Sequence, residues 1–101
     1  MDFEWDEKKN KKNFEKHGIK FTEAVEIFKN FHFSKIDTRK RYGEQRTISI
    51  GTLENIVIVV VHTRRKQNTR VISARKANKK ERRQFYEDFK KETGQDQKNL
   101  R

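Results

Sequence analysis

The segment RVISARKANKKERRQFY, residues 70–86, carries the signals of a short strand that turns directly into a basic helix. Val71 and Ile72 supply the apolar residues typical of a strand. Asn78 stands where a helix N-cap is expected, and Glu81 follows three residues later, which gives an Asn version of the capping box. The segment therefore predicts a strand and a helix joined by a very short connection.

Arginines are distributed through both of these predicted elements, at Arg70, Arg75, Arg82 and Arg83. A planar guanidinium on a rigid element can make fixed, paired hydrogen bonds to a phosphate group. Side chains alternate between the two faces of a strand, so Ile72 and Ala74 are expected to point toward the helices. Arg75 is then expected to lie on the opposite, more open face of the sheet.

The composition predicts one small domain with a thin core. The chain has 101 residues, of which 31% are apolar and 41% are charged. We expect a single domain over residues 1–93 and a flexible polar tail over residues 94–101. The absence of cysteine excludes a disulfide, a thiolate metal site and a cysteine nucleophile.

Positive charge is concentrated in the later part of the chain. Residues 1–31 contain seven Lys and seven Asp or Glu, and so carry no net charge. Residues 32–101 contain nineteen Lys or Arg against eight Asp or Glu, which accounts for the whole net charge of +11. A surplus confined to one part of the fold favours a polyanionic partner, nucleic acid first. A solubilising surface or an acidic protein partner would also fit this charge.

The N-terminal part predicts two short helices. Asp6 is expected to cap the first helix, which runs to about Lys16 and ends at Gly18. Thr22 is expected to cap the second helix, whose buried side includes Ala24. Both helices are too short to be stable without the rest of the fold.

After these helices the hydrophobic period changes to two, which predicts four strands over residues 32–37, 45–52, 56–62 and 69–76, and then a helix over residues 79–93. The sequence IVIVVVH in the third strand is apolar on both faces, so this strand should be central. The tight connection before it favours antiparallel pairing. The predicted fold class is α+β, with two N-terminal helices, a four-stranded antiparallel sheet and a C-terminal helix, and with the helices mainly on one face.

Several kinds of functional site have no signal in the sequence. His17, His32 and His62 lack paired spacing, so no metal site is predicted, and there is no glycine-rich phosphate loop. The longest apolar run is too short to span a bilayer, and the N-terminus lacks the order typical of a signal peptide. We therefore expect a cytoplasmic protein without a metal, a cofactor or a membrane partner.

The polar residues that remain form a set that can cleave RNA without a metal. In that reaction the 2′-OH of the RNA attacks the neighbouring phosphate. The enzyme must supply a base for the 2′-OH proton, an acid for the leaving 5′-oxygen, and cations for the charge that builds on the phosphate. Arginines meet the last need, and His, Glu or Tyr can meet the first two.

Motifs along nearly the whole chain resemble those of one family, the BrnT-type toxins of bacterial type II toxin–antitoxin systems, which belong to the RelE-like ribonuclease superfamily. The resemblance rests on a series of short matches in order: FEWD at 3–6, KHG at 16–18, the helix residues Phe21, Ala24 and Phe28, YGEQR at 42–46, Gly51, Thr-x-Arg at 63–65, and the segment 70–86. The RelE-like fold that it implies agrees with the α+β layout predicted from the hydrophobic pattern.

The resemblance implies a metal-independent endoribonuclease that cleaves mRNA and inhibits translation. It also implies a cognate DNA-binding antitoxin, similar to BrnA, that neutralises the toxin in a hetero-oligomer. Operator DNA would then be contacted only through the antitoxin, as the complex represses its own operon.

The candidate site residues fall into two groups, and the resemblance implies all of them except Arg64, which adds charge beside Arg65, and Lys79, which belongs to a solvated or RNA-backbone-facing surface. The catalytic candidates are Arg75, Arg65, Arg46, His17 and Glu44. The RNA-binding candidates are Arg64, Arg82, Tyr86 and Lys79, of which Lys79 would contact the RNA backbone without specificity. The chain departs from the family pattern at Arg64 and His62, which occur where an acidic and an aromatic residue are expected.

Each candidate also has a structural interpretation. His17 can cap the end of the first helix, and Glu44 can form a salt bridge with a nearby arginine. Arg46 can pack at the edge of the core, and Tyr86 can belong to the core of the last helix. These interpretations support an alternative function, a basic module that binds nucleic acid or an antitoxin without chemistry.

Overall fold

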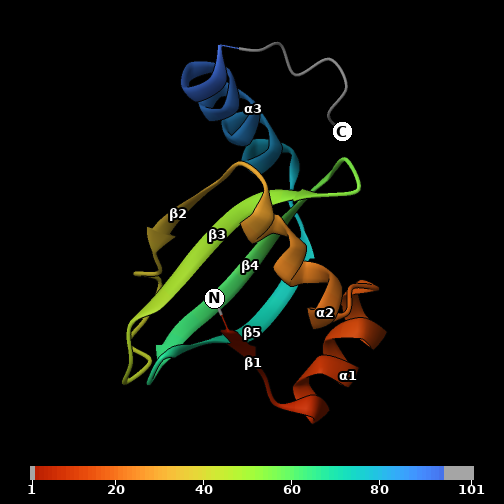
Figure 1. Cartoon of the computed structure of the whole chain (residues 1–101), viewed down its shortest axis with the longest axis vertical. Helices are drawn as coiled ribbons and strands as arrows, with labels where there is room; N and C mark the ends of the chain where they lie inside the picture. Colours follow the sequence, from red (N-terminus) through yellow and green to blue (C-terminus); the bar gives the residue numbers. More distant parts are fainter. Residues whose placement is uncertain (1, 95–101) are drawn as a thin grey trace.

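The structure is a computed structural model that describes residues 2–94. Its elements follow the chain in the order β1 (Asp2–Glu4), α1 (Glu7–His17), α2 (Phe21–Ala24), the 3₁₀ helix η1 (Val25–Lys29), β2 (His32–Ile36), β3 (Arg46–Leu53), β4 (Ile56–Arg65), β5 (Asn68–Lys76) and α3 (Lys79–Thr93) (Figure 1). The α+β class is therefore confirmed. None of these helices has the length and apolarity that a bilayer span requires.

One sheet contains all five strands, in the order β1-β5-β4-β3-β2. The four predicted strands pair antiparallel as expected, but β1 joins them in parallel beside β5. The prediction of a four-stranded antiparallel sheet was thus wrong in detail, and the sheet is mixed. Strand β1 has only three residues, too few to show an alternating pattern.

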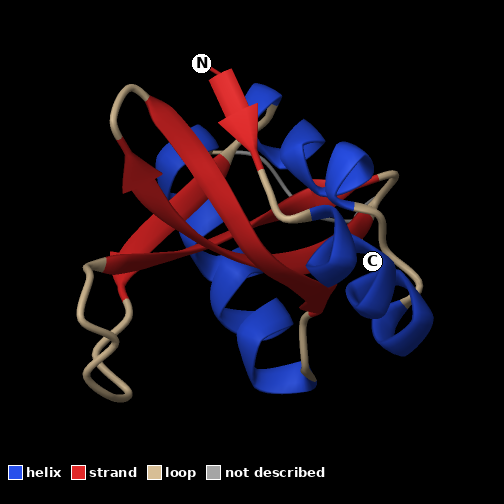
Figure 2. Ribbon diagram, turned by 90° about the horizontal axis from the view of Figure 1, so that it is seen from below, coloured by secondary structure: helices blue, strands red, loops and turns tan. Residues whose placement is uncertain are grey.

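Strand β4 is buried on both faces and divides the core into two clusters. Ile58 and Val60 face one cluster, together with Ile19, Phe21, Ala24, Ile27, Val71 and Ala74. Val57, Val59 and Val61 face the other, together with Ile48, Ile50, Ala77 and Phe85. We call these the α1–α2 face and the α3 face of the sheet. Helices therefore lie on both sides of the sheet (Figure 2), and the prediction that they lie mainly on one face was wrong.

A β-bulge in β5 changes which side chains share a face. Ser73 pairs with Val61, whereas the next residue of β4, His62, pairs with Val71, so Ile72 is the extra residue. Ala74 and Val71 therefore both pack on the α1–α2 face, and Ile72 packs with the cluster on the α3 face. The prediction was right for Ala74 and wrong for Ile72, because simple alternation does not survive a bulge.

The helix ends follow local chemistry at most positions. Asp6 accepts hydrogen bonds from the backbone of α1, and Gly18 ends this helix in the left-handed region at φ 72°. In α3, the Asn78 and Glu81 side chains each accept the other's backbone N–H at 2.8 Å, which confirms the capping box. The predicted cap at Thr22 was wrong: the Glu23 carboxylate accepts from the backbone N–H of Lys20, which starts α2 earlier.

Gly94 ends α3 in the left-handed region, at φ 69°. The predicted flexible tail begins at this residue, and its remaining residues, 95–101, lie outside the described part of the chain.

The free edge of β5 is closed partly by a strand and partly by one side chain. Strand β1 pairs with residues 68–70. Farther along β5, the Asn13 amide accepts from the Ala74 N–H at 3.1 Å and donates to the Ala74 carbonyl at 2.9 Å. Asn13 also donates to the Ile19 carbonyl at 3.0 Å and is buried. The Asn13 side chain thus makes the two backbone hydrogen bonds that a neighbouring strand would make with Ala74. It also fixes α1 against this residue, which precedes Arg75.

We predict that Asn13→Ala destabilises the fold by roughly 2–4 kcal/mol, because it leaves a buried backbone donor and acceptor without partners. Urea unfolding followed by circular dichroism measures the change. Lys12→Ala, an exposed neighbour on the same helix, is the control and should change stability little. Equal stability of the two variants would show that the Asn13 bonds contribute nothing.

His62 lies on the α1–α2 face, at a position where an aromatic residue was expected. Its ring packs edge-on against Phe28 at 5.1 Å between centroids, and its Nε2 is 2.7 Å from the Ser49 hydroxyl. Burial, with a smaller effect from His32, lowers the pKa of His62 to about 4. The ring is therefore neutral near pH 7 and acts as a packed aromatic with one polar contact.

We predict that acidification destabilises the chain through His62. Its folded pKa lies below the ordinary 6.5, so the unfolded state binds the proton more readily, and stability falls as pH drops from about 6.5 to about 4. The loss should be on the order of 2 kcal/mol after allowance for partial exposure. Stability measured against pH should fall by this much more in the wild type than in His62→Gln, which keeps the contributions of the other groups with lowered pKa values. Parallel curves for the two proteins would contradict the assignment.

Candidate functional site

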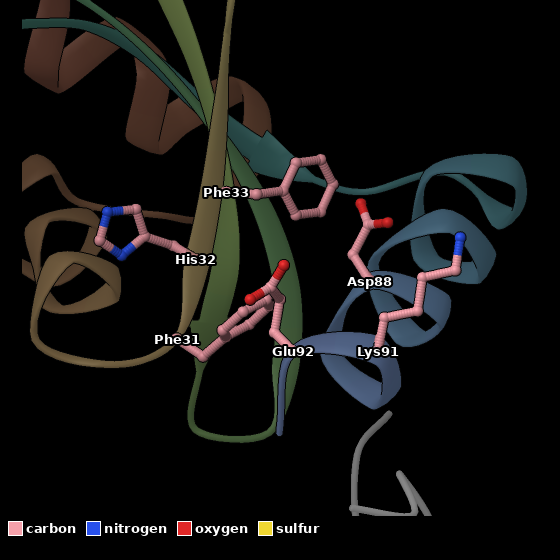
Figure 3. Close-up of a pocket in the computed structure, with 6 residues that line it drawn as sticks. All are labelled: Phe31, His32, Phe33, Asp88, Lys91 and Glu92. Atoms are coloured by element: carbon pink, nitrogen blue, oxygen red, sulfur yellow. The ribbon is translucent and has the colours of Figure 1, made fainter. Parts of the chain in front are cut away.

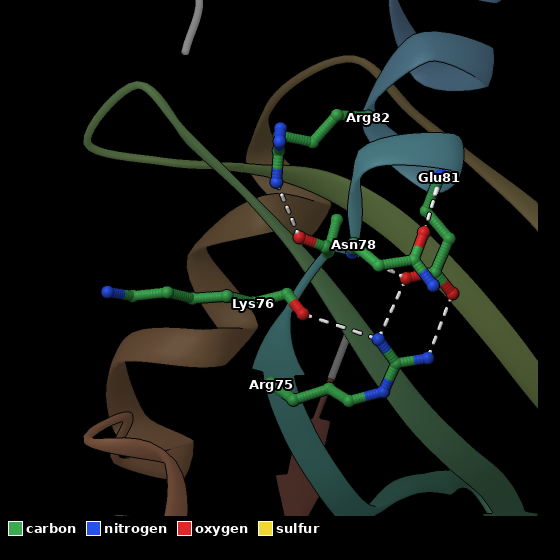
Figure 4. Close-up of polar contacts among 6 residues, drawn as sticks. Arg75, Lys76, Asn78, Glu81 and Arg82 are labelled. Carbon is green, nitrogen blue, oxygen red and sulfur yellow. Dashed lines mark hydrogen bonds and ion pairs between the residues drawn. The ribbon is translucent and has the colours of Figure 1, made fainter.

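Arg75 is held on the α3 face by a bidentate ion pair. It pairs in the sheet with Val59, and its Nη1 and Nη2 donate to the two carboxylate oxygens of Glu81, each at 2.8 Å (Figure 4). Nη1 also donates to the Lys76 carbonyl at 3.3 Å. Two guanidinium N–H groups, one on Nε and one on Nη2, remain for another acceptor.

Glu81 serves the helix and the arginine at the same time. Its Oε1 accepts from the Asn78 N–H and from Arg75, so the start of α3 fixes the position of the guanidinium. The hydrogen bond to Arg75 lowers the pKa of Glu81, and the same bond raises the pKa of Arg75. Both groups stay charged, and Arg75 keeps an exposed fraction of 35%.

Arg46 is fixed by an aromatic ring and a carboxylate. Its guanidinium carbon lies 4.0 Å from the centre of the Tyr42 ring, and its Nε donates to Glu44 at 3.2 Å. Arg46 pairs with Thr63 and shares its face with Ile48, so it belongs to the α3 face. Both the predicted role of Glu44 as a salt-bridge partner and the packing of Arg46 at a core edge are realised in this geometry.

Two cations of the α3 face had no predicted role. Arg39 donates from Nε and Nη2 to the buried Asp37 carboxylate at 2.8 Å, and this bond lowers the pKa of Asp37. The charge of Arg39 acts on Arg75 and opposes the rise of its pKa. The charge of Lys35 likewise lowers the pKa of Glu81. Lys35 shares its strand face with Phe33, which was a usable signal, whereas Arg39 lies in an irregular loop without periodicity.

The adjacent residues Arg64 and Arg65 lie on opposite faces of the sheet. Arg65 borders a shallow pocket with Glu4 on the α3 face, and its charge helps to lower the pKa of Glu4. Arg64 borders a different pocket, with Thr47 and His62, on the α1–α2 face. Of the two arginines, only Arg65 shares a face with Arg46 and Arg75.

His17 lies at the last residue of α1, close enough to Arg75 for their charges to interact. Burial lowers the pKa of His17, and the charges of Lys16 and Arg75 lower it further. The imidazole is therefore biased toward its neutral form, which can accept a proton. The Asn13 bonds to Ala74 hold this helix beside the strand that carries Arg75.

The α3 candidates occupy different environments. Arg82 donates from Nη1 to the Ala77 carbonyl at 3.0 Å, so its contact is with the helix start rather than with Glu81 (Figure 4). Tyr86 is half-buried and packs edge-on against Phe85, as the core interpretation predicts. Lys79 is exposed in the first turn of the helix.

The cations on the α3 face form what we call the basic face, which consists of Lys35, Arg39, Arg46, Arg65, Arg70 and Arg75. Four of these arginines each form an ion pair with one carboxylate. The pairs are Arg39–Asp37, Arg46–Glu44, Arg70–Glu4 and Arg75–Glu81. The partners Thr63 of Arg46 and Val59 of Arg75 are four residues apart on β4, about 13 Å at about 3.3 Å per residue. His17 thus lies with Arg75, and Glu44 lies with Arg46.

Among residues 2–94, no three His, Asp or Glu side chains are grouped as the ligands of a metal ion would be.

Comparisons with known proteins identify the family. No curated protein sequence matches the chain. The family model described as the ribonuclease toxin BrnT of type II toxin–antitoxin systems matches residues 5–81. A type II system implies a protein antitoxin as partner. Because the match spans well over half of its length, the chain belongs to the BrnT family of ribonuclease toxins of type II toxin–antitoxin systems.

Proposed function

We propose that this chain is a metal-independent endoribonuclease that cleaves mRNA on the basic face of its sheet. The observation that carries the proposal is the set of arginines held in place by carboxylates on one face, in a family named for ribonuclease activity. Arginines fixed before the substrate arrives stabilise developing phosphate charge without reorganising.

Arg75 is the proposed ligand of the scissile phosphate. Its two remaining N–H donors can bind phosphate oxygens while Glu81 keeps the guanidinium in place. Arg46 lies about 13 Å farther along the sheet at about 3.3 Å per residue, so it would bind a different phosphate of the same strand. Arg65 extends the same track. Arg82, Tyr86 and Lys79 border it on α3 and would contribute to binding.

His17 is the proposed general base. Burial lowers its pKa, which favours the neutral imidazole that can accept a proton. His17 ends α1, the helix that Asn13 fixes against Ala74, the residue before Arg75. It would take the proton of the 2′-OH as the 2′-oxygen attacks phosphorus. The bond to the 5′-oxygen then breaks, the 5′-oxygen takes a proton from the His17 imidazolium or from water to leave as a 5′-OH, and the other product ends in a 2′,3′-cyclic phosphate. Glu44, which is engaged by Arg46, is the alternative base.

Cleavage of mRNA would inhibit translation in the cytoplasm. The antitoxin would be a DNA-binding, BrnA-like protein that neutralises the toxin in a hetero-oligomer, and operator DNA would be bound through the antitoxin. Family membership supports this arrangement. The surplus of positive charge, +11 over the chain, also suits a partner or substrate that is acidic.

We predict that Arg75→Ala lowers kcat for RNA cleavage by roughly 10²–10³-fold, because it removes a preorganised donor to the transition state. The measurement is cleavage of a defined mRNA in EDTA, with detection of the cyclic phosphate. Arg83→Ala removes the same charge from an exposed position of α3 and should leave kcat nearly unchanged.

Three outcomes would contradict the proposal. Loss of cleavage in EDTA would show that the reaction needs a metal ion. Products without a cyclic phosphate would show that the 2′-OH is not the nucleophile. RNA binding without any cleavage, alone or in translating extract, would favour the non-catalytic binding module.

We predict that His17→Ala lowers kcat by about 10²–10⁴-fold and removes the acidic limb of the pH–rate profile. That limb should lie below pH 6.5, because the pKa of His17 is lowered from this value. Lys12→Ala, at an exposed position of the same helix, is the control. If His17→Ala lowers stability but keeps kcat and the acidic limb, His17 is only a helix cap.

A further inference from the structure

The two edges of the sheet are treated differently by the fold. On one side, β1 and the Asn13 side chain cover parts of β5, and β1, the outermost strand there, has only three residues. The edge at β2 pairs inward with β3 over all five residues, and no other strand within residues 2–94 pairs with its outer side. The register between β2 and β3 contains no bulge. Such an edge can accept another extended chain.

The ladder shows which backbone groups of β2 point outward. The Asp37 N–H donates to the Arg46 carbonyl at 2.8 Å, so residue 37 is a hydrogen-bonded position. In an antiparallel pair these positions alternate, so Phe33 and Lys35 also bond to β3. His32, Ser34 and Ile36 therefore direct their backbone N–H and C=O groups away from the sheet.

Apolar surface lies on both sides of this edge. Toward α3, a groove is lined by Phe31, Phe33, Asp88, Lys91 and Glu92, with His32 at its margin. Figure 3 shows Phe33 directed toward α3 and His32 directed the other way. On the opposite side of the strand, Ile36 is 57% exposed, the most exposed large apolar residue of the described chain. An added strand with apolar side chains on both of its faces would cover both surfaces.

The charges next to β2 indicate what kind of chain would pair with this edge. Strand β2 leads directly into Arg39, Lys40 and Arg41, all exposed. A chain that continues past Ile36 along this edge meets these three cations, so acidic residues there would be complementary. Backbone amides and carbonyls in a ladder select a polypeptide, not a nucleic acid.

We propose that the outer edge of β2 docks an extended segment of the antitoxin, apolar beside Phe33 and acidic at the end that meets Arg39, which adds a sixth strand to the sheet. This proposal rests on the toxin assignment and names the surface that its protein partner uses. The segment buries Ile36 and enters the groove beside Phe33, and its acidic end lies against the loop of Arg39.

Amide hydrogen exchange, read by NMR for single residues, tests the pairing. The probe is the purified antitoxin encoded beside the gene of this chain. The N–H groups of Ser34 and Ile36 should exchange at least about tenfold more slowly in the complex than in the free toxin. Those of Phe33 and Lys35 are protected in both states. Unchanged exchange at Ser34 and Ile36 in a formed complex overturns the proposal, as does protection in the free toxin that grows with concentration, which indicates self-pairing.

A matched pair of variants tests the same edge without NMR. Ser34→Pro removes a backbone N–H that points away from the sheet and leaves the hydrogen bonds between β2 and β3 intact. Ser34→Ala keeps this N–H. Both lose the hydroxyl contact between Ser34 and Ser49. Antitoxin affinity should fall at least about tenfold for Ser34→Pro relative to Ser34→Ala. Equal affinities overturn the proposal. If circular dichroism shows that Ser34→Pro is unfolded, the exchange result on the wild-type complex decides.

These measurements are independent of catalysis. A toxin that binds its antitoxin through β2 and cleaves no RNA would refute the proposed function and support the docking edge. A toxin that cleaves RNA and shows no protection at β2 in the complex would support the proposed function and refute the docking edge.

Discussion

Strand β4 carries apolar side chains on both faces, and this constraint determines where every helix lies. Val59 needs cover on one side and Val60 on the other. The N-terminal helices cover one face, and α3 covers the other. Helix α3 packs against the part of its face near Phe33 and Ile50, so the part near Arg46 and Thr63 is left for polar side chains. The division of the core thus creates the basic face.

Glu81 links the covered and uncovered parts of that face. The same carboxylate closes the capping box of α3 and holds Arg75, so helix start and arginine position are one structural unit. Arg46 is likewise held by two neighbours at once, since its guanidinium lies over the Tyr42 ring and its Nε donates to Glu44. Each arginine therefore has little rotameric freedom to lose when a phosphate binds, which favours a rigid site over an adaptive one.

Local sequence signals were sufficient for most of the fold. The capping box at Asn78 and the central position of β4 were predicted because each depends on neighbouring residues or on a short hydrophobic pattern. Strand β1 was missed because three residues gain a partner only through the long-range contact with β5. Ile72 was assigned to the wrong face because a bulge adds one residue to the strand, and no local signal marks it.

The candidate site was predictable where strand parity operates. Alternation and the motif together singled out Arg75, and parity with Ile48 placed Arg46 on the same face. The placement of Arg64 and Arg65 on opposite faces was not predicted, because the expected strand ended at residue 62 whereas β4 runs to Arg65. Arg39 could not be found, because it approaches Arg75 only through the path of an irregular loop. The roles of these residues in cleavage stay predictions.

The closure of the β5 edge by β1 and Asn13 limits how copies of this chain can assemble. A sheet with two open edges can grow without end, since each added subunit offers a new edge to the next. Within residues 2–94 the two outermost strands are β1, with only three residues, and β2, with five, so β2 offers the longer edge for strand addition. Growth of a fibre through both sheet edges is thereby disfavoured, because one of the two edges gives an added strand very little backbone to pair with.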